Sequence, residues 1–190
     1  MRIIRVEHGG TSYYGILEDG LVFRLHQQPG HMEPIPLSEA KVLPLVTPSK
    51  VVCVGLNYKA HAEELGYPLP NMPSFFLKPP SSIIGNGEPI VLPSGMGRIE
   101  HEAELAMVVG KVCRNLTPEE AEESLFGFTC ANDVTAREVQ KVDPLIGHCK
   151  SYDTFCPIGP WIETELEDIN DLSIRCLVNG EVRQSANTGD

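Results

Sequence analysis

Short apolar runs separated by turn residues make up the first 25 residues. The runs RIIRVE, TSYYGIL and LVFRL are rich in β-branched and aromatic residues, and the turn segments His8–Gly10 and Glu18–Gly20 separate them. Gly-Gly and Asp-Gly supply the positive φ angles that tight hairpin turns need. The pattern therefore predicts a β-meander at the N-terminus.

Polar and proline-rich sequence follows over residues 27–48. Prolines at this density interrupt both helices and central strands, so we interpret the segment as a linker. The chain is accordingly predicted to consist of a small N-terminal β unit with its linker, residues 1–48, and a main domain, residues 49–190.

The main domain combines short buried-type strands with short helices. A helix is predicted from Asn57, as its N-cap, to about Leu65, with Gly66 as its stop. Thr117-Pro118-Glu119-Glu120 is a capping box with proline at the first helical position, and a further short helix is expected after Asp133. Strands are predicted at residues 51–55, 99–109, 126–132 and 155–163, followed by a hairpin closed by Asn179-Gly180. The fold class is mostly β with short helices (α+β).

Composition narrows the classes of function. The 15 Lys and Arg against 26 Asp and Glu give a net charge of −11, and so acidic a chain disfavours sequence-independent nucleic-acid binding. No apolar run approaches the ~20 residues that span a bilayer, and the N-terminus lacks the apolar core of a signal peptide. The six cysteines show no C-x-x-C spacing. We expect a cytoplasmic protein that binds neither membrane nor nucleic acid.

Three glutamates alternate along the predicted strand 99–109. In one continuous strand Glu100, Glu102 and Glu104 lie on the same face, and successive glutamates are ~6.5–7 Å apart along the backbone. Like charges at this spacing repel, and a hard divalent cation such as Mg²⁺ or Mn²⁺ offsets that repulsion. A solvated strand face accounts for the same pattern.

Three further segments contain candidate catalytic groups. Asp133 stands at a strand-to-helix junction, where it is either a functional carboxylate or a helix N-cap. His61 and Glu64 are three residues apart on a predicted helix, so their side chains can touch. They form either a general-base dyad or a solvated surface pair. Lys150 is a candidate for binding an anionic group. Arg137 and Gln140 are three residues apart and share one face of the predicted helix. The alternative to a functional role is that both are ordinary polar surface residues.

Taken together and in order, these segments resemble the fumarylacetoacetate hydrolase family over about residues 50–190. The matching blocks are GLNYKAHAEELG, FFLKPPSSIIG, IEHEAELAMVVGK, FGFTCANDVTAREVQ, CKSYDTFCPIGPWI and LVNGEVRQSANTGD. The family's fold is a mixed β-sheet roll, and a small β unit precedes it in many bacterial members. The segments after the NTGD block of the family have no counterpart in this sequence, so the resemblance implies a domain truncated at its C-terminus.

The resemblance implies a role for each candidate. The family's ligands for a divalent metal, Mg²⁺ or Mn²⁺, fall on Glu102, Glu104 and Asp133, and Glu100 receives no ligand role. The catalytic His/Glu dyad on a mobile helix falls on His61 and Glu64, and the lysine near the metal falls on Lys150. Positions that contact substrate in relatives fall on Arg137 and Gln140.

The resemblance also implies a function. Family members act on small anionic 2-oxo or 1,3-dicarbonyl acids through a metal-stabilised enolate, so we expect hydrolysis of the C–C bond of an acylpyruvate-type substrate. An isomerase, a tautomerase or a decarboxylase of the same family is the alternative, as is an inactive truncated chain that binds metal. The resemblance further implies a homodimer.

Overall fold

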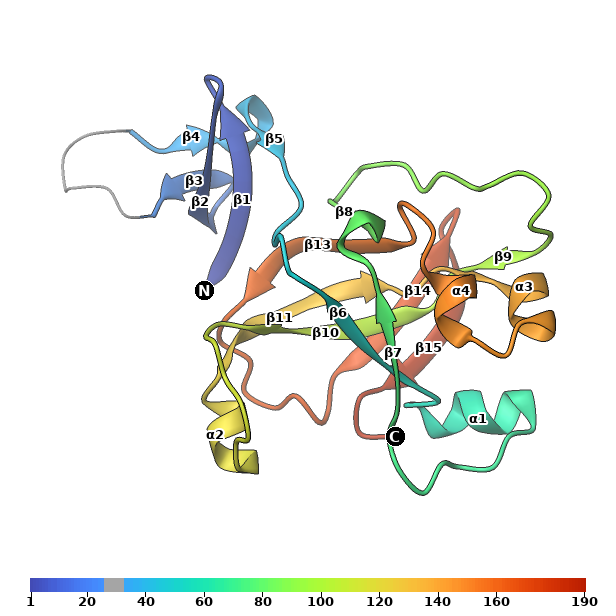
Figure 1. Ribbon diagram of the computed structural model, residues 1–190. Helices are drawn as coiled ribbons and strands as arrows, with labels where there is room; N and C mark the ends of the chain where they lie inside the picture. Colours follow the sequence, from blue (N-terminus) through green and yellow to red (C-terminus); the bar gives the residue numbers. More distant parts are fainter. Residues whose placement is uncertain (26–32) are drawn as a thin grey trace.

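A computed structural model gives the fold of the protein and describes residues 1–25 and 33–190. Within these ranges the chain is mostly β with four short α-helices, so the predicted fold class is confirmed (Figure 1). None of the helices in this part of the chain is both long and apolar enough to cross a bilayer.

The N-terminal meander forms as predicted. It consists of β1 (Arg2–His8), β2 (Thr11–Glu18) and β3 (Leu21–Arg24), paired antiparallel in sequence order. Both connecting turns use positive φ angles, at Gly9 and Gly10 and at Asp19 and Gly20. The turn dipeptides therefore set this part of the fold locally.

The predicted linker contains regular structure in its described part. Residues 26–32 lie outside the described residues, but β4 (Ile35–Pro36) pairs with β3, and β5 (Lys41–Val42) pairs with β1. A 3₁₀ helix, Leu37–Glu39, lies between them. Two-residue strands next to prolines have no periodicity of their own, so only the edge of the meander makes them strands.

One large sheet runs through both parts of the chain, in the order β10-β11-β13-β1-β2-β3-β4. Its main-domain strands are β10 (Ala103–Val109), β11 (Leu125–Asn132) and β13 (Cys156–Glu163). β1 pairs with β13 through Arg2 opposite Glu163 and Ile3 opposite Ile162. β8 (Ile83–Ile84) joins β13 in parallel. The N-terminal meander therefore continues the sheet of the main domain (Figure 1).

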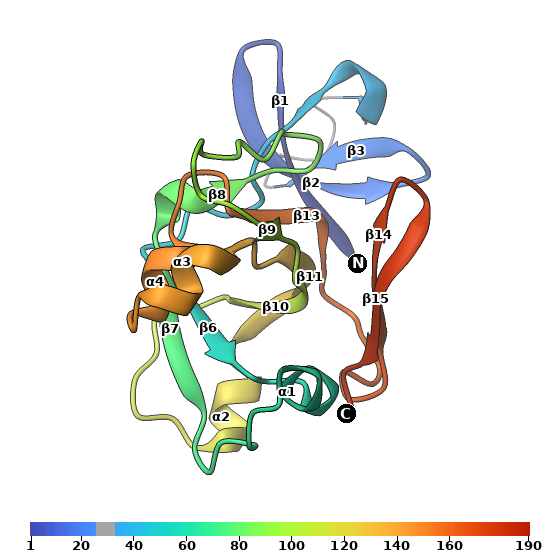
Figure 2. The same cartoon turned by 90° about the vertical axis from the view of Figure 1, so that its right-hand side faces the viewer.

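Three two-stranded sheets complete the β structure. They pair β6 (Val51–Gly55) with β7 (Ser74–Lys78), β9 (Ile99–Glu100) with β12 (Thr135–Ala136), and β14 (Ser173–Val178) with β15 (Glu181–Asn187). The hairpin β14–β15 stands at the opposite side of the molecule from α3 and α4 (Figure 2).

The helices are α1 (Lys59–Leu65), α2 (Pro118–Glu122), α3 (Arg137–Val142) and α4 (Ile146–Lys150). The capping box at Thr117 and Glu120 forms, and Gly66 ends α1 in the left-handed conformation, as predicted. The prediction that Asn57 caps α1 is wrong, because Tyr58 takes that position without a side-chain hydrogen bond.

The predicted strand 99–109 is interrupted. It divides into β9 and β10 at His101 and Glu102, and the two pieces belong to different sheets. The expectation that Glu100 shares one strand face with Glu102 and Glu104 is therefore wrong. A side chain satisfies the backbone at the interruption, because Oδ1 of Asn132 accepts a hydrogen bond from the backbone N–H of Glu102 at 2.9 Å.

Two apolar cores lie on either side of this break. The larger one joins β1 to β13 around Ile4, Val6 and Ile162. The smaller one contains Val134 and Phe155, together with Ala136 and Cys149. Because the smaller core packs the segment after β11 against α4, it brings the neighbourhoods of Asp133 and Lys150 together.

Candidate functional site

The end of β11 and the start of β10 place two carboxylates side by side. Ala103, the first residue of β10, is paired with Asn132, the last residue of β11. Glu102, just before β10, and Asp133, just after β11, therefore lie at the same end of the strand pair. The backbone N–H of Asp133 donates to the carbonyl oxygen of Glu102 at 2.8 Å. We call Glu102, Glu104 and Asp133 the carboxylate cluster, since these are the three predicted metal ligands.

Asp133 is not a helix N-cap. The following helix, α3, begins four residues later at Arg137, and Ala136 occupies its N-cap position. The carboxylate of Asp133 is instead buried, with two lysine ammonium groups on its two oxygens, Lys78 on Oδ1 at 2.6 Å and Lys150 on Oδ2 at 2.5 Å. Of the two interpretations left open by the sequence, the structure excludes the cap.

Lys150 joins two members of the carboxylate cluster. Its buried Nζ donates to Oε2 of Glu102 at 2.7 Å, to Asp133 and to the hydroxyl of Thr135 at 2.8 Å. Burial disfavours the ammonium, but the carboxylates of Asp133 and Glu102 outweigh it and raise the pKa of Lys150 above its ordinary value. This direction favours the charged ammonium form of Lys150 inside the site.

Arg137 holds the other side of Glu102. Its guanidinium donates to Glu102, to Oε2 of Glu100 at 2.5 Å and to Oε1 of Gln140 at 2.9 Å. Burial opposes ionisation of Glu102, yet Lys150 and then Arg137 outweigh it and hold its pKa below the ordinary value. The structure thus brings Arg137 and Gln140 to the cluster; their predicted contact with substrate stays a prediction.

Glu104 has a different environment from its neighbours. It lies two residues after Glu102, within β10, and no hydrogen bond or ion pair joins its carboxylate to another described residue. Burial, and then the carboxylates of Asp133 and Glu102, raise the pKa of Glu104 to about 8. Its ionised form therefore lacks the compensation that Glu102 receives.

The helix α1 carries the predicted His61/Glu64 dyad. Glu64 is exposed, and the side chain of His61 lies outside what the structure describes, so the dyad stays a prediction. Tyr58 directly precedes the helix. Burial and then the Glu104 carboxylate raise the pKa of Tyr58. The start of α1 is thus within electrostatic reach of the cluster.

The donor types of the cluster fit a hard divalent cation. Carboxylate oxygens are the ligands that Mg²⁺ and Mn²⁺ prefer, and the Glu104 carboxylate has no hydrogen bond or ion pair with another described residue, although the Lys150 ammonium acts on it at longer range. In the part of the chain that the structure describes, no three donors converge at ligand spacing. The Lys150 ammonium bridges Glu102 and Asp133.

Sequence reasoning missed Lys78, the other lysine on Asp133. It is the last residue of β7, and its side chain is fully buried. The signal was present in the alternation of β7, where Phe76 and Lys78 are buried while Phe75 and Leu77 are exposed. A lysine on the buried face of a strand requires a buried partner of opposite charge.

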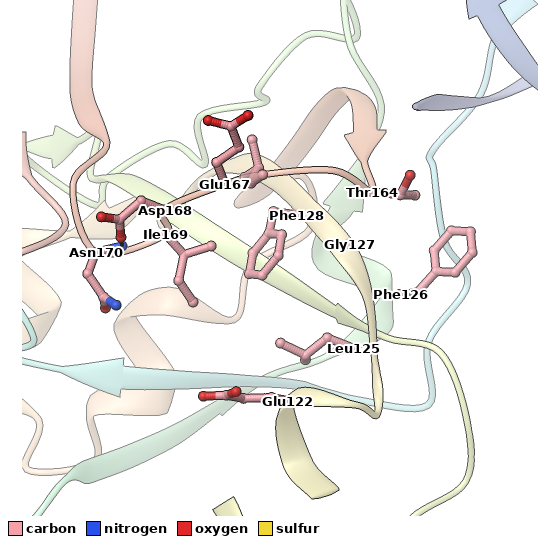
Figure 3. Close-up of a pocket in the computed structure, with 11 residues that line it drawn as sticks. Glu122, Leu125, Phe126, Gly127, Phe128, Thr164, Glu167, Asp168, Ile169 and Asn170 are labelled. Atoms are coloured by element: carbon pink, nitrogen blue, oxygen red, sulfur yellow. Dashed lines mark hydrogen bonds between the residues drawn. The ribbon is translucent and has the colours of Figure 1, made fainter. Parts of the chain in front are cut away.

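A separate groove lies away from the cluster and contains none of the predicted site residues. It has a volume of about 410 Å³ and runs between the N-terminal half of β11 and the segment after β13 (Figure 3). Leu125, Phe128 and Ile169 supply apolar surface, and Glu167 and Asp168 make its rim acidic. With no cation among its lining residues, the groove has no feature that selects a small anionic acid.

Comparison with known proteins identifies the family. The model described as "Fumarylacetoacetate (FAA) hydrolase C-terminal" matches residues 50–190. The chain belongs to the fumarylacetoacetate hydrolase family. A second model, "Rv2993c-like, N-terminal", matches residues 1–44 of this family member. The resemblance inferred from the sequence blocks is thereby confirmed.

Curated relatives of this family member include proteins with and without an assigned activity. An uncharacterised protein of Archaeoglobus fulgidus is 46% identical over 156 residues, which cover 82% of this chain and 62% of the relative. The human mitochondrial oxaloacetate tautomerase is 43% identical over 161 residues, covering 81% of this chain and 51% of that protein. The chain thus spans about half to three fifths of the length of these relatives.

Solved structures are similar to this chain along its whole length. A 5-carboxymethyl-2-hydroxymuconate δ-isomerase from Mycobacterium smegmatis has a TM-score of 0.88 at 39% identity, covering 100% of this chain and 76% of that one. A maleylpyruvate hydrolase from Sphingobium sp. SYK-6, in complex with manganese(II) and pyruvate, has a TM-score of 0.79 at 30% identity, covering 100% and 78%. Named members of the family are therefore enzymes: isomerases, tautomerases and hydrolases.

Proposed function

We propose that the protein is a divalent-metal-dependent enzyme acting on small anionic 2-oxo or 1,3-dicarbonyl acids, with Mg²⁺ or Mn²⁺ as cofactor. The observation that carries the proposal is the carboxylate cluster itself. The buried Lys150 ammonium bonds to Glu102 and Asp133, and the Glu104 carboxylate lies within electrostatic reach of both without a hydrogen bond or ion pair to another described residue. The manganese and pyruvate in the Sphingobium hydrolase support the same class of cofactor and ligand.

Each residue of the cluster has a role in this proposal. Glu102, Glu104 and Asp133 would hold the divalent cation, which when bound polarises the 2-oxo carbonyl group of a substrate. Lys150 provides a fixed positive charge beside the carboxylates, suited to stabilising a developing oxyanion. Arg137 orients the Glu102 carboxylate through its guanidinium and is itself oriented by Gln140.

Hydrolysis of an acylpyruvate is the reaction we propose. The oxygen of a water molecule adds to the distal carbonyl carbon, and the adjacent C–C bond breaks. Its electron pair stays on C3 of pyruvate, which takes up one proton of the water, and the other proton is released, so the products are a carboxylate, pyruvate and one proton. We assign the activation of water to His61, oriented by Glu64, on the basis of the family pattern.

Tautomerisation is the second candidate. It moves one proton between C3 and the C2 oxygen of a 2-oxo acid, so neither water nor bond cleavage is involved. The human relative named an oxaloacetate tautomerase, 43% identical to this chain, favours it. A decarboxylase would use the same substrate and release CO₂.

An absorbance assay with product analysis tests these proposals. Purified protein is incubated with acetylpyruvate or oxaloacetate in Mg²⁺, Mn²⁺ or EDTA, beside protein-free samples with the same metal. Glu102→Ala is the test variant, and Glu39→Ala, an exposed glutamate of the N-terminal unit, is the matched control.

The products separate the candidate reactions. Acetate and pyruvate from acetylpyruvate indicate the hydrolase, faster enol–keto exchange of oxaloacetate without net consumption indicates the tautomerase, and CO₂ with pyruvate indicates the decarboxylase. We expect metal-dependent turnover that Glu102→Ala abolishes and Glu39→Ala retains. Turnover in EDTA equal to that in Mn²⁺ contradicts the proposed metal dependence.

Two further proposals follow, the first from the family resemblance and the second from the sequence pattern alone. We propose a homodimer and a cytoplasmic location. Sedimentation velocity at two protein concentrations tests the first, since a stable dimer sediments as about 42 kDa, twice the 20.9 kDa of one chain. A species of one chain's mass at both concentrations contradicts it.

A further inference from the structure

Lys78 is a buried charge for which the proposed function has no role. Its side chain is 0% exposed, and its Nζ donates to Oδ1 of Asp133 at 2.6 Å and to the carbonyl oxygen of Val134 at 3.4 Å. Burying an ammonium is costly unless it is paired and hydrogen-bonded, so the buried position of Lys78 depends on its contact with Asp133.

The two lysines on Asp133 come from different elements and contact different oxygens. Lys78, from β7, contacts Oδ1, while Lys150, from α4, contacts Oδ2. The backbone of Asp133 is also held, because its N–H donates to Glu102. With both oxygens and the backbone fixed, the carboxylate plane of Asp133 has a single orientation.

The two lysines differ in what else they contact. Lys150 also donates to Glu102 and to Thr135, and its ammonium lies 5.0 Å from the ring centroid of Phe76. Among the described residues, Lys78 has Asp133 as its one carboxylate partner. A change at Lys78 therefore acts on the carboxylate cluster through Asp133.

We propose that Lys78 is a positioning residue that orients the Asp133 carboxylate as a ligand for the divalent cation. The inference rests on the proposed function, because it takes Asp133 to be a metal ligand. Hydrogen-bond partners of metal ligands fix ligand orientation, and their removal typically lowers metal affinity by about 10- to 100-fold.

The test is manganese binding to the intact chain, measured without substrate. The dissociation constant of Mn²⁺ is obtained from the electron paramagnetic resonance signal of free Mn²⁺, and the line shape of bound Mn²⁺ reports the symmetry of its ligands. The variants are Lys78→Met, which removes charge and donors, and Lys78→Arg, which retains both. Lys41→Met, at an exposed lysine of β5, is the matched control.

We expect Lys78→Met to weaken Mn²⁺ binding by about 10- to 100-fold and to alter the bound line shape. Lys78→Arg should restore affinity to within several-fold of the parent, and Lys41→Met should match the parent. Far-UV circular dichroism in EDTA verifies the fold of each variant. If Lys78→Met does not fold, Lys78→Gln replaces it, because its amide still donates to a carboxylate without carrying charge.

The outcomes separate this inference from the proposed function. If the parent binds Mn²⁺ and a folded Lys78→Met or Lys78→Gln variant binds it within twofold of the parent, the proposed role of Lys78 is wrong. The proposed metal site is not affected by that result. Parent protein that binds no Mn²⁺ overturns the proposed metal site and, with it, this role.

Discussion

Neighbouring side chains of one type behave differently in this protein because their partners differ. Glu102 and Glu104 are two residues apart, yet the pKa of Glu102 is held below its ordinary value while that of Glu104 is raised to about 8. Lys150 and Arg137 bond directly to Glu102, whereas Glu104 has no such bond with another described residue. Charge compensation, rather than burial alone, thus separates the two carboxylates.

The Glu104→Gln substitution should change how stability depends on pH in EDTA. The folded protein keeps a proton on Glu104 up to about pH 8, while the unfolded chain releases it near the ordinary glutamate pKa of 4.5. The folded state binds more protons across that window, so this group lowers stability as pH rises through it. The charged groups facing it are Asp133, Glu102 and Lys150, with Tyr58 nearby.

Melting temperatures from pH 5 to pH 9 measure this effect. The gain of Glu104→Gln over the parent should grow with pH through the window, and Glu39→Gln should run parallel to the parent. A constant offset between Glu104→Gln and the parent would show that Glu104 ionises normally.

The six thiols should differ in reactivity toward Ellman's reagent at pH 8. Cys113 and Cys130 are exposed, while Cys149 and Cys156 are buried. Burial, and then the Asp133 carboxylate, raise the pKa of Cys53 to about 12, which leaves almost no thiolate at this pH. We expect two fast thiols in the native protein and six in denaturant; fast labelling of Cys53, identified by mass spectrometry, would contradict this assignment.

At the level of elements, the large sheet depends on close approach between strands. A Cβ at Gly127 of β11 would lie 2.5 Å from the carbonyl oxygen of Glu163 and 2.7 Å from Cγ2 of Ile162, both in β13. Backbone cannot move aside cheaply at such a contact. The pairing of β11 with β13 therefore requires glycine at this position.

The Gly127→Ala substitution should destabilise the fold by about 1–3 kcal/mol, the usual cost of overpacking. Gly55→Ala is the matched strand control, because its nearest contact would be an ordinary 3.6 Å. Urea unfolding of both variants provides the comparison. Equal midpoints for the two would show that β11 and β13 adjust without cost.

The Gln184 amide of β15 bonds the hairpin β14–β15 to the start of β10. Oε1 of Gln184 accepts from the backbone N–H of Ala103 at 3.0 Å and lies 3.1 Å from Nδ1 of His101. These bonds fasten the hairpin to the interruption between β9 and β10, directly beside Glu102. The hairpin thus supports the segment that carries the carboxylate cluster.

The Gln184→Leu substitution should loosen this hairpin. It leaves the Ala103 N–H without its acceptor, at a cost of about 1–3 kcal/mol. Amide hydrogen exchange should therefore accelerate in β14 and β15 more than in β1 and β2. Arg183→Leu, at the exposed neighbouring position, is the control and should leave the exchange pattern unchanged.

At the level of the whole molecule, metal and stability should be linked. A ligand that binds the folded state alone stabilises it by about 2.7 kcal/mol at a concentration 100 times its dissociation constant. We expect Mn²⁺ to raise the melting temperature of the parent in a concentration-dependent way and to have much less effect on Asp133→Asn. Equal shifts in the two proteins would place the bound ion elsewhere.

The sequence by itself determined what depends on neighbouring residues. Glycine, aspartate and asparagine at the turns specified the meander and the last hairpin, and the capping box specified the start of α2. These features follow from φ angles and hydrogen bonds within four residues, so the local sequence contains all their causes. The ordered blocks of residues likewise sufficed to identify the family.

Only the tertiary structure decided which charges meet. The strand predicted at 99–109 is interrupted because Asn132, 30 residues from Glu102, accepts from its backbone. Lys78 and Asp133 are 55 residues apart in sequence, yet Nζ of Lys78 lies 2.6 Å from Oδ1 of Asp133 in the fold. The periodicity of a strand reports which face a side chain takes and not which partner it finds there. Pairing between distant residues arises from sheet register and core packing, and these depend on the whole chain.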